Sequence, residues 1–345
     1  MLARMEMTLG STRTPAVAIG LAAMGSALFV EHRSREAERR HQAPHHHIYI
    51  EGTRLHYRLE GEGPPVLLVH GNVVHGADFD ASGLVERLAR EYQVLVIDRP
   101  GFGHSDRPRG RVWTPAVQAR LLRQAAAALG VERPVVVGHS LGAQVALAMA
   151  LQDPLRTAGL VLVSGYYWPG LRLDRWMAAP LAVPVLGDLL RYTTAAWTAR
   201  ATLDLQVRAM FAPAPVPADF FKLLPRELLL RPLQQRAAAE DASHLVKQAR
   251  MLQKRYASLR LPTTVVAGAH DRIVSPEQSL RLHACLPQAR LRMLEGVGHM
   301  THYQAQEQIA AGIKQAFAAG AAVGASAGDV ASAARPPVAV PAPAG

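Results

Sequence analysis

PVVVGHSLG, residues 134–142, is the most informative stretch of this chain of 345 residues. Its valines are typical of a strand buried on both faces, and the run LGAQVALAMALQDP that follows the serine is typical of a helix. Ser140 must therefore make a sharp strand-to-helix turn. Gly138 and Gly142 leave room for the strained backbone of such a turn, and His139 leads into it. We predict that Ser140 is a nucleophile with its Oγ held clear of the sheet, rather than an ordinary helix N-cap serine.

Apolar runs of the same kind recur on both sides of this stretch, and helical patterns separate them. Two short strands in IYIEGTRLHYRLEG open the series, and the other runs are PVLLVHG (65–71), YQVLVID (92–98), GLVLVSG (159–165), PTTVVAGAHD (262–271) and ARLRMLEGVGH (289–299). Strands that alternate with helices predict an α/β fold with a mostly parallel sheet. From 166 to about 258 the alternation stops, and helical pieces punctuated by prolines predict an insertion.

A serine is a poor nucleophile at neutral pH and needs a histidine base that an acid orients. The expected order along the chain is serine, acid, histidine. Asp271 ends the strand PTTVVAGAH, at the edge where open α/β sheets place their sites, and His299 follows the last strand in the loop EGVGHMTH. We predict Asp271 as the acid and His299 as the base. His302 is the rival base, whereas Asp98 and Asp106 precede the serine and are predicted to structure their own loop.

A tetrahedral intermediate also needs backbone N–H donors for its oxyanion. Leu141 opens the helix after the serine, and His70-Gly71-Asn72 follows the strand PVLLV. We predict that the N–H groups of Asn72 and Leu141 form the oxyanion hole, with His70 and Gly71 in its supporting loop. A purely structural role for the side chains of His70 and Asn72 fits the sequence equally well.

The motifs HGN, DRPGFGHSDRP, GHSLG, GAHD and GVGH, in this order, resemble those of the α/β-hydrolase superfamily over residues 48–317. The resemblance is to the branch that includes esterases, haloperoxidase-like enzymes, epoxide hydrolases and C–C bond hydrolases. It implies an eight-stranded, mostly parallel sheet flanked by helices, with the insertion forming a lid after the sixth strand. Haloalkane dehalogenases and epoxide hydrolases of this fold carry an aspartate at the nucleophile turn, so Ser140 argues against those two activities.

The resulting prediction is a serine hydrolase that cleaves carboxylic esters through an acyl-enzyme on Ser140. The insertion is rich in aromatic residues and holds three of the four tryptophans, which predicts an apolar pocket for a fairly apolar ester or related acyl substrate. The aromatic residues include Tyr166, Tyr167, Trp168, Trp176, Tyr192, Trp197, Phe211, Phe220 and Phe221. A serine-dependent C–C bond hydrolase or perhydrolase is the alternative, and a catalytically inactive membrane-tethered binding protein is the remote one. No feature calls for a metal or an organic cofactor.

The segment 1–47 combines the uncharged apolar run PAVAIGLAAMGSALFV (15–30) with a charged linker, EHRSREAERRH. The run is slightly shorter than the about 20 residues that span a bilayer, yet we predict an uncleaved membrane anchor there. The alternatives are a cleaved signal that yields a secreted or periplasmic enzyme, and a cytoplasmic enzyme that starts at Met24. Arginines flank the run on both sides and do not decide which side of the membrane carries the enzyme.

Residues 318–345 form an Ala/Gly/Pro/Val tract without periodicity, which predicts a disordered tail. The formal charge of +11 comes from scattered arginines rather than from a basic stripe, so nucleic acid is not an expected partner. The histidine triplet at 45–47 has no acidic or cysteine partner and is assigned to the linker. The single cysteine, Cys285, excludes an internal disulfide, and nothing in the sequence indicates an oligomeric state.

Overall fold

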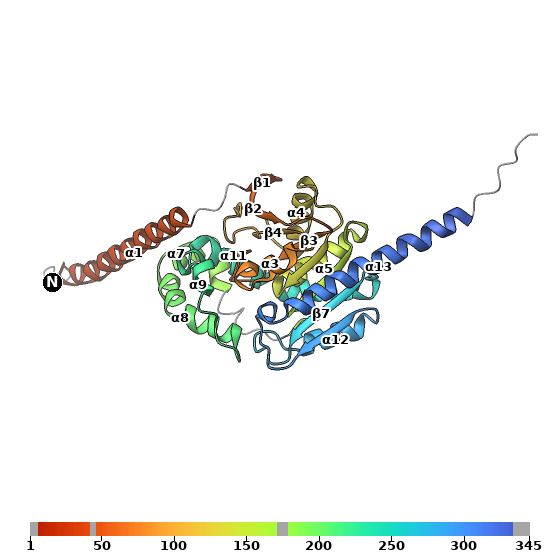
Figure 1. Ribbon diagram of the computed structural model, residues 1–345. Coiled ribbons are helices and arrows are strands. Elements are labelled where there is room, and N and C mark those ends of the chain that lie inside the picture. Colours follow the sequence, from red (N-terminus) through yellow and green to blue (C-terminus); the bar gives the residue numbers. More distant parts are fainter. Residues whose placement is uncertain (1–5, 42–45, 171–178, 334–345) are drawn as a thin grey trace, which may run out of the picture.

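The computed structural model describes residues 6–41, 46–170 and 179–333. Its strands form one eight-stranded sheet in the order β1-β2-β4-β3-β5-β6-β7-β8 (Figure 1). The strands are β1 His47–Ile50, β2 Thr53–Glu60, β3 Pro65–Val69, β4 Gln93–Ile97, β5 Val135–His139, β6 Gly159–Val163, β7 Thr263–Gly268 and β8 Arg290–Leu294. β2 pairs antiparallel with β1 and β4, and all other pairs are parallel. The predicted α/β-hydrolase architecture is confirmed.

Helices flank the sheet on both faces. Outside the insertion the described helices that follow β1 are α2 Asp78–Ala81, α3 Leu84–Ala89, α4 Pro115–Ala128, α5 Leu141–Gln152, η1 Pro154–Arg156, α12 Glu277–Cys285, η3 Thr301–Tyr303 and α13 Gln306–Ala333, and α1 Glu6–Arg40 precedes the sheet in the chain. Alternate residues of β3 face two different apolar clusters. Leu67 belongs to the cluster that includes residues of α4, α5 and α12, and Leu68 belongs to the cluster that includes residues of α3 and α13. The central strands are continuous apolar runs because both of their faces are buried in this way.

The insertion lies between β6 and β7, at the place predicted for the lid. It comprises α7 Leu186–Tyr192, α8 Thr194–Phe211, α9 Phe220–Leu223, α10 Arg226–Leu229, α11 Pro232–Leu252 and η2 Gln253–Ser258. Leu203, Phe211 and Phe220 share an apolar cluster with Met300, which follows β8, so the insertion packs against the loop that carries His299. Trp176, one of the aromatic residues predicted for the insertion, lies outside the described residues.

Over Glu6–Arg40 the N-terminal segment is helical throughout and has no separate linker after the apolar run. α1 is one helix that contains both the apolar run and the charged stretch. Ion pairs at i,i+4 spacing, Arg35 with Glu31 at 2.7 Å and Arg40 with Glu36 at 2.5 Å, stabilise the charged half as helix. The histidine triplet is likewise not wholly linker, because His47 begins β1.

The C-terminal helix corrects the predicted disordered tail. α13 continues past residue 318 to Ala333. Its first turns bury Ile309 and Ile313 against the sheet, and the alanines that follow have the highest helix propensity of all residues, so the helix extends through them. Residues 334–345 lie outside the described residues, and for them the tail stays a prediction.

Candidate active site

Ser140 lies at the turn between β5 and α5. Its backbone is left-handed, with φ 54° and ψ −117°, a conformation that costs a residue with a side chain about 1–3 kcal/mol. Its N–H donates to the carbonyl of Val163 on β6 at 2.8 Å. A Cβ at Gly138 would lie 2.5 Å from the carbonyl oxygen of Gly142, and one at Gly142 would lie 2.1 Å from that of Val69. Only glycine fits at either position, so the turn has the geometry expected from its motif.

His299 connects Ser140 to Asp271. The Nε2 atom of His299 lies 3.0 Å from Ser140 Oγ, and its Nδ1 atom lies 2.8 Å from Asp271 Oδ2. The other oxygen of Asp271 accepts hydrogen bonds from the backbone N–H groups of Ile273 and Val274, each at 2.8 Å. The histidine and the aspartate are both buried. The structure thus brings the three predicted residues into one hydrogen-bonded relay.

The rival base, His302, is engaged with a different carboxylate. Its Nε2 atom lies 2.9 Å from Asp78 Oδ2, and both side chains are fully buried. The hydroxyl of Tyr303 donates to the other oxygen of Asp78 at 2.8 Å. The site therefore contains two buried Asp–His pairs, and the one that reaches the serine contains His299.

His139 lies between these two pairs. Its Nε2 atom is 3.1 Å from the carbonyl oxygen of His299, and its ring centroid is 4.4 Å from that of His302. Burial, with the nearby His302 and His299, holds the pKa of His139 well below its usual value, so at pH 7 the ring is neutral and Nε2 donates to the carbonyl. His139 thereby holds the main chain of the base.

One set among the described residues offers ligand atoms for a metal ion. These atoms belong to Asp78, His139 and His302, and all lie within 4.8 Å of one another. The contact of Asp78 with His302, at 2.9 Å, and the packing of His139 on His302 already account for that proximity. That the site needs no metal or cofactor stays a prediction.

The loop His70-Gly71-Asn72 lies directly against the serine. A Cβ on Gly71 would lie 3.2 Å from the Cβ of Ser140. His70 Nδ1 donates to the carbonyl of Gly71 at 2.8 Å, and Nε2 accepts from the N–H of Arg99 at 2.9 Å. This pair of bonds requires a neutral ring. Burial and the charge of Arg99 hold the pKa of His70 well below its usual value, which favours that form.

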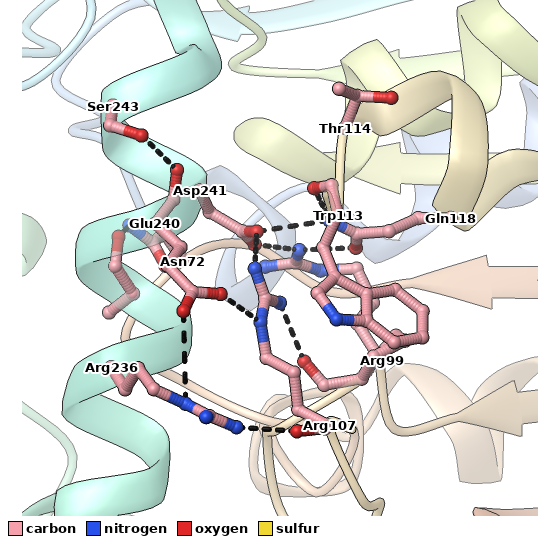
Figure 2. Close-up of polar contacts among 12 residues, drawn as sticks. Asn72, Arg99, Arg107, Trp113, Thr114, Gln118, Arg236, Glu240, Asp241 and Ser243 are labelled. Atoms are coloured by element: carbon pink, nitrogen blue, oxygen red, sulfur yellow. Dashed lines mark hydrogen bonds and ion pairs between the residues drawn. The ribbon is translucent and has the colours of Figure 1, made fainter. Parts of the chain in front are cut away.

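Arg99 holds this loop in place, a role that the sequence reasoning missed. Fully buried, it donates to the carbonyl oxygens of His70 at 3.0 Å and Gly71 at 2.8 Å. Figure 2 shows the carboxylate of Asp241 between the guanidinium groups of Arg99 and Arg107, at 2.5 Å and 2.9 Å. Both arginines stand in the motif DRPGFGHSDRP, which was available as a signal, whereas nothing local marks Asp241.

Helix α11, which carries Asp241, also contacts the loop directly. The side-chain amide of Asn72 donates to the carbonyl of Ala238 at 3.1 Å, and that of Gln234 donates to the carbonyl of Val73 at 2.6 Å. Val73 has φ 72°, a strained conformation for a β-branched residue. The insertion thus fixes the shape of the loop, and the side chain of Asn72 contributes to that shape.

Asp98 structures the loop of its own motif, as predicted. It accepts hydrogen bonds from the backbone N–H groups of Gly76 at 2.8 Å and His104 at 3.0 Å, and lies 2.8 Å from His56 Nδ1. Asp106 forms an ion pair with Arg54 of β2 at 2.9 Å. Neither carboxylate is hydrogen-bonded to Ser140 or His299, so neither is part of the relay.

A parallel sheet with a strained serine turn, an acid after β7 and a histidine after β8 defines the class of α/β hydrolases. The family described as alpha/beta hydrolase fold matches residues 64–306, and the chain belongs to this family of hydrolases.

The chain is similar to hydrolases of several chemistries. It is 28% identical over 279 residues to haloalkane dehalogenase 2 of Mycobacterium tuberculosis, covering 76% of this chain and 91% of that protein. It is 27% identical over 265 residues to the 2-hydroxy-6-oxononadienedioate/2-hydroxy-6-oxononatrienedioate hydrolase 2 of Pseudomonas putida, covering 74% and 88%. A thermophilic esterase from Thermogutta terrifontis has the same fold, with a TM-score of 0.63, 23% identity, and 79% and 97% of the two chains covered.

Proposed function

We propose that this hydrolase cleaves carboxylic esters, with Ser140 as nucleophile, His299 as base and Asp271 as the orienting acid. One observation carries the proposal: His299 lies 3.0 Å from the serine hydroxyl and 2.8 Å from the aspartate. Both distances fall within the about 2.6–3.2 Å over which a positioned base takes a proton. The strained turn at Ser140 supports the same assignment, because backbone strain of this kind concentrates at functional sites.

The relay supplies each proton transfer of an acyl-transfer reaction. His299 takes the proton of Ser140 as Oγ attacks the ester carbonyl carbon, and the oxyanion that forms accepts from the N–H groups of Asn72 and Leu141. The carbon–oxygen bond to the alcohol then breaks, and His299 protonates the departing alcohol. Water attacks the acyl-enzyme with His299 again as base, which releases the acid and restores Ser140. Asp271 keeps the imidazole in the tautomer with its proton on Nδ1.

Other reactions of the family fit this site less well. Dehalogenases of this fold carry an aspartate where this chain has Ser140, so we do not propose dehalogenation despite the name of one relative. C–C bond hydrolysis or perhydrolysis is the second candidate, because it uses the same relay and the Pseudomonas putida relative is named as a hydrolase of a dienedioate. A catalytically inactive binding protein is disfavoured because all three residues of the relay are present.

We also propose that α1 anchors the enzyme to a membrane. The stretch Pro15–Arg40 is long and apolar enough to cross a bilayer, by length and composition, and only 6% of its most apolar window is buried. A core helix of a soluble protein would instead bury such residues. Ile19 and Leu28, for example, are 70% and 65% exposed. A signal sequence passes the same test of length and composition, so cleavage of the N-terminus in its native host is the competing outcome.

Covalent labelling of Ser140 tests the catalytic proposal. A fluorophosphonate probe is expected to label the wild-type chain and not Ser140→Ala, which also loses hydrolysis of p-nitrophenyl acyl esters by about 10⁴-fold or more. Ser164→Ala is the matched control: Ser164 also has a left-handed backbone, at the end of β6, and bonds to Thr301 at 2.7 Å instead of to His299. It is expected to keep labelling. Full activity of Ser140→Ala would refute the proposal.

A substrate panel separates the two candidate chemistries. Esters of increasing acyl length report the size of the apolar pocket, and cleavage of any of them supports the esterase. Labelling of Ser140 combined with inert esters and turnover of a vinylogous diketone would replace the esterase by the C–C bond hydrolase.

A further inference from the structure

Helix α1 is docked on the insertion rather than tethered loosely to it. Ser26 lies at the contact: its hydroxyl donates to the carbonyl of Tyr192 at 2.8 Å and accepts from the indole N–H of Trp197 at 2.9 Å. One helical turn later the ring of Phe29 stacks on Trp197, with centroids 5.2 Å apart. The contact therefore joins the apolar half of α1 to the start of α8.

The charged half of α1 continues the contact. Arg33 pairs with Glu227 of α10 at 2.9 Å, and Glu38 pairs with Arg231, just before α11, at 2.8 Å. Val30 and Ala37, on the same part of α1, are buried. In Figure 1 the end of α1 lies beside the insertion helices while its N-terminal half projects away from the domain. Contacts spread from Ser26 to Glu38, about three helical turns, fix the position of the insertion along the helix axis.

The position of Ser26 within the apolar run sets a depth. The run ends at Val30 and the charged residues begin at Glu31. At about 1.5 Å of rise per residue, Ser26 lies about 6 Å inside the end of the run. The indole of Trp197 donates to Ser26 and therefore lies at the same depth. Amphipathic segments at a membrane surface sit at a similar depth, about 5–10 Å into the boundary between headgroups and acyl chains.

The side chains gathered there have the chemistry of a membrane interface. Trp197 and Tyr192 each combine an aromatic ring with a polar atom, the type enriched where bilayer meets water. The hydroxyl of Tyr192 reaches the charged side of the boundary, 3.3 Å from Glu31. Nearby, the start of α7 exposes an apolar edge at Val185, which is 80% exposed, and Leu189, which is 58% exposed.

We infer that the insertion itself is a membrane-binding surface: the edge formed by Val185, Leu189 and Trp197 enters the headgroup region of a phospholipid bilayer, and α1 sets its depth. This inference rests on the proposed anchoring by α1. It identifies lipid-like esters at the membrane surface as the substrate class, because the insertion that packs against the His299 loop would then contact them directly.

Single cysteines placed on the two surfaces test the inference. Cys285→Ser makes the chain cysteine-free, and Leu189→Cys then carries an environment-sensitive fluorophore on the proposed surface. Leu155→Cys is the matched control, because Leu155 is 84% exposed on η1, outside the insertion. In phosphatidylethanolamine–phosphatidylglycerol vesicles, the fluorophore at position 189 is expected to shift to the blue and to be quenched several-fold by brominated acyl chains. The fluorophore at position 155 is expected to do neither.

Two further reporters make every outcome decisive. Leu21→Cys reports whether α1 is inserted, and Val185→Cys replaces Leu189→Cys if the latter fails to fold, as judged by fluorophosphonate labelling in detergent. Quenching at 21 but not at 189 or 185 overturns the membrane-binding surface while keeping the anchor. No quenching at 21 overturns both. Either result leaves hydrolysis of soluble esters unchanged, so neither can be mistaken for failure of the proposed catalysis.

Discussion

At the scale of single residues, the site depends on which histidine reaches the serine. His299 and His302 are three positions apart and each faces a buried aspartate, Asp271 and Asp78 respectively. Only His299 lies within hydrogen-bond distance of Ser140. The pair of Asp78 and His302 packs against His139, which in turn holds the main chain of His299. Removal of each histidine should therefore have a different consequence.

We expect His299→Gln to lower kcat/KM for ester hydrolysis by about 10⁴-fold or more, because the serine loses its base. His302→Gln is expected to retain kcat/KM within about tenfold, because His302 does not contact Ser140. It should instead lower the free energy of unfolding by about 1–3 kcal/mol, the cost of disturbing a buried polar contact. Steady-state kinetics and denaturant unfolding on both variants check this. If His302→Gln proved the less active of the two, the assignment of the base would be reversed.

At the scale of elements, helix α11 joins the insertion to the loop that faces the serine. Asp241 balances two buried arginines, and one of them, Arg99, holds the carbonyl groups of residues 70 and 71. A buried pair of this kind contributes little net stability by itself, but losing one partner leaves the other charge buried and unpaired. Asp241 therefore supports the loop at residues 70–72 through Arg99.

We expect Asp241→Asn to lower the free energy of unfolding by about 3–5 kcal/mol. Asp204→Asn is the control, because Asp204 pairs with Arg226 on the surface, where both side chains are about half exposed. Surface pairs contribute at most about 1 kcal/mol. Denaturant titration followed by tryptophan fluorescence measures both changes. Equal stability of the two variants would contradict the role given to Asp241.

At the scale of the whole molecule, buried histidines make the fold sensitive to acid. Burial lowers the pKa of His70, His75 and His139, and it lowers the pKa of His104 from 6.5 to about 4. At a pH between the ordinary histidine pKa of 6.5 and the lowered pKa of the folded state, which is about 4 for His104, the unfolded chain binds protons that the folded chain does not. Stability therefore rises with pH through this window and is lost as the pH falls below about 6.5.

We expect the Tm to fall as the pH is lowered from 7 to 5, by about 2–4 °C for each kcal/mol lost. His104→Gln removes one of the groups responsible, so its Tm should fall less over the same interval. Calorimetry of both proteins at matched ionic strength provides the comparison. Parallel Tm curves would show that His104 does not contribute.

Much of the fold followed from local pattern. The apolar runs at 65–71 and 134–140 became β3 and β5, because a strand buried on both faces must be apolar throughout. The prediction failed where composition misled: residues 318–333 lack periodicity, yet alanine continues α13 through them. The prediction of a linker after the apolar run is also wrong, because i,i+4 ion pairs stabilise the charged stretch as helix.

The serine turn could be predicted from local sequence, since the glycines around Ser140 and the strand and helix that flank it are consecutive in the chain. Order along the chain was enough to nominate Asp271 and His299. Three features became visible only in the folded molecule: Asp78 contacts His302, Asp241 supports the loop beside the serine, and α1 docks on the insertion. The physical reason is distance along the chain: Arg99 and Asp241 are 142 positions apart. Such pairs have no local pattern, because they are brought together by the packing of whole elements.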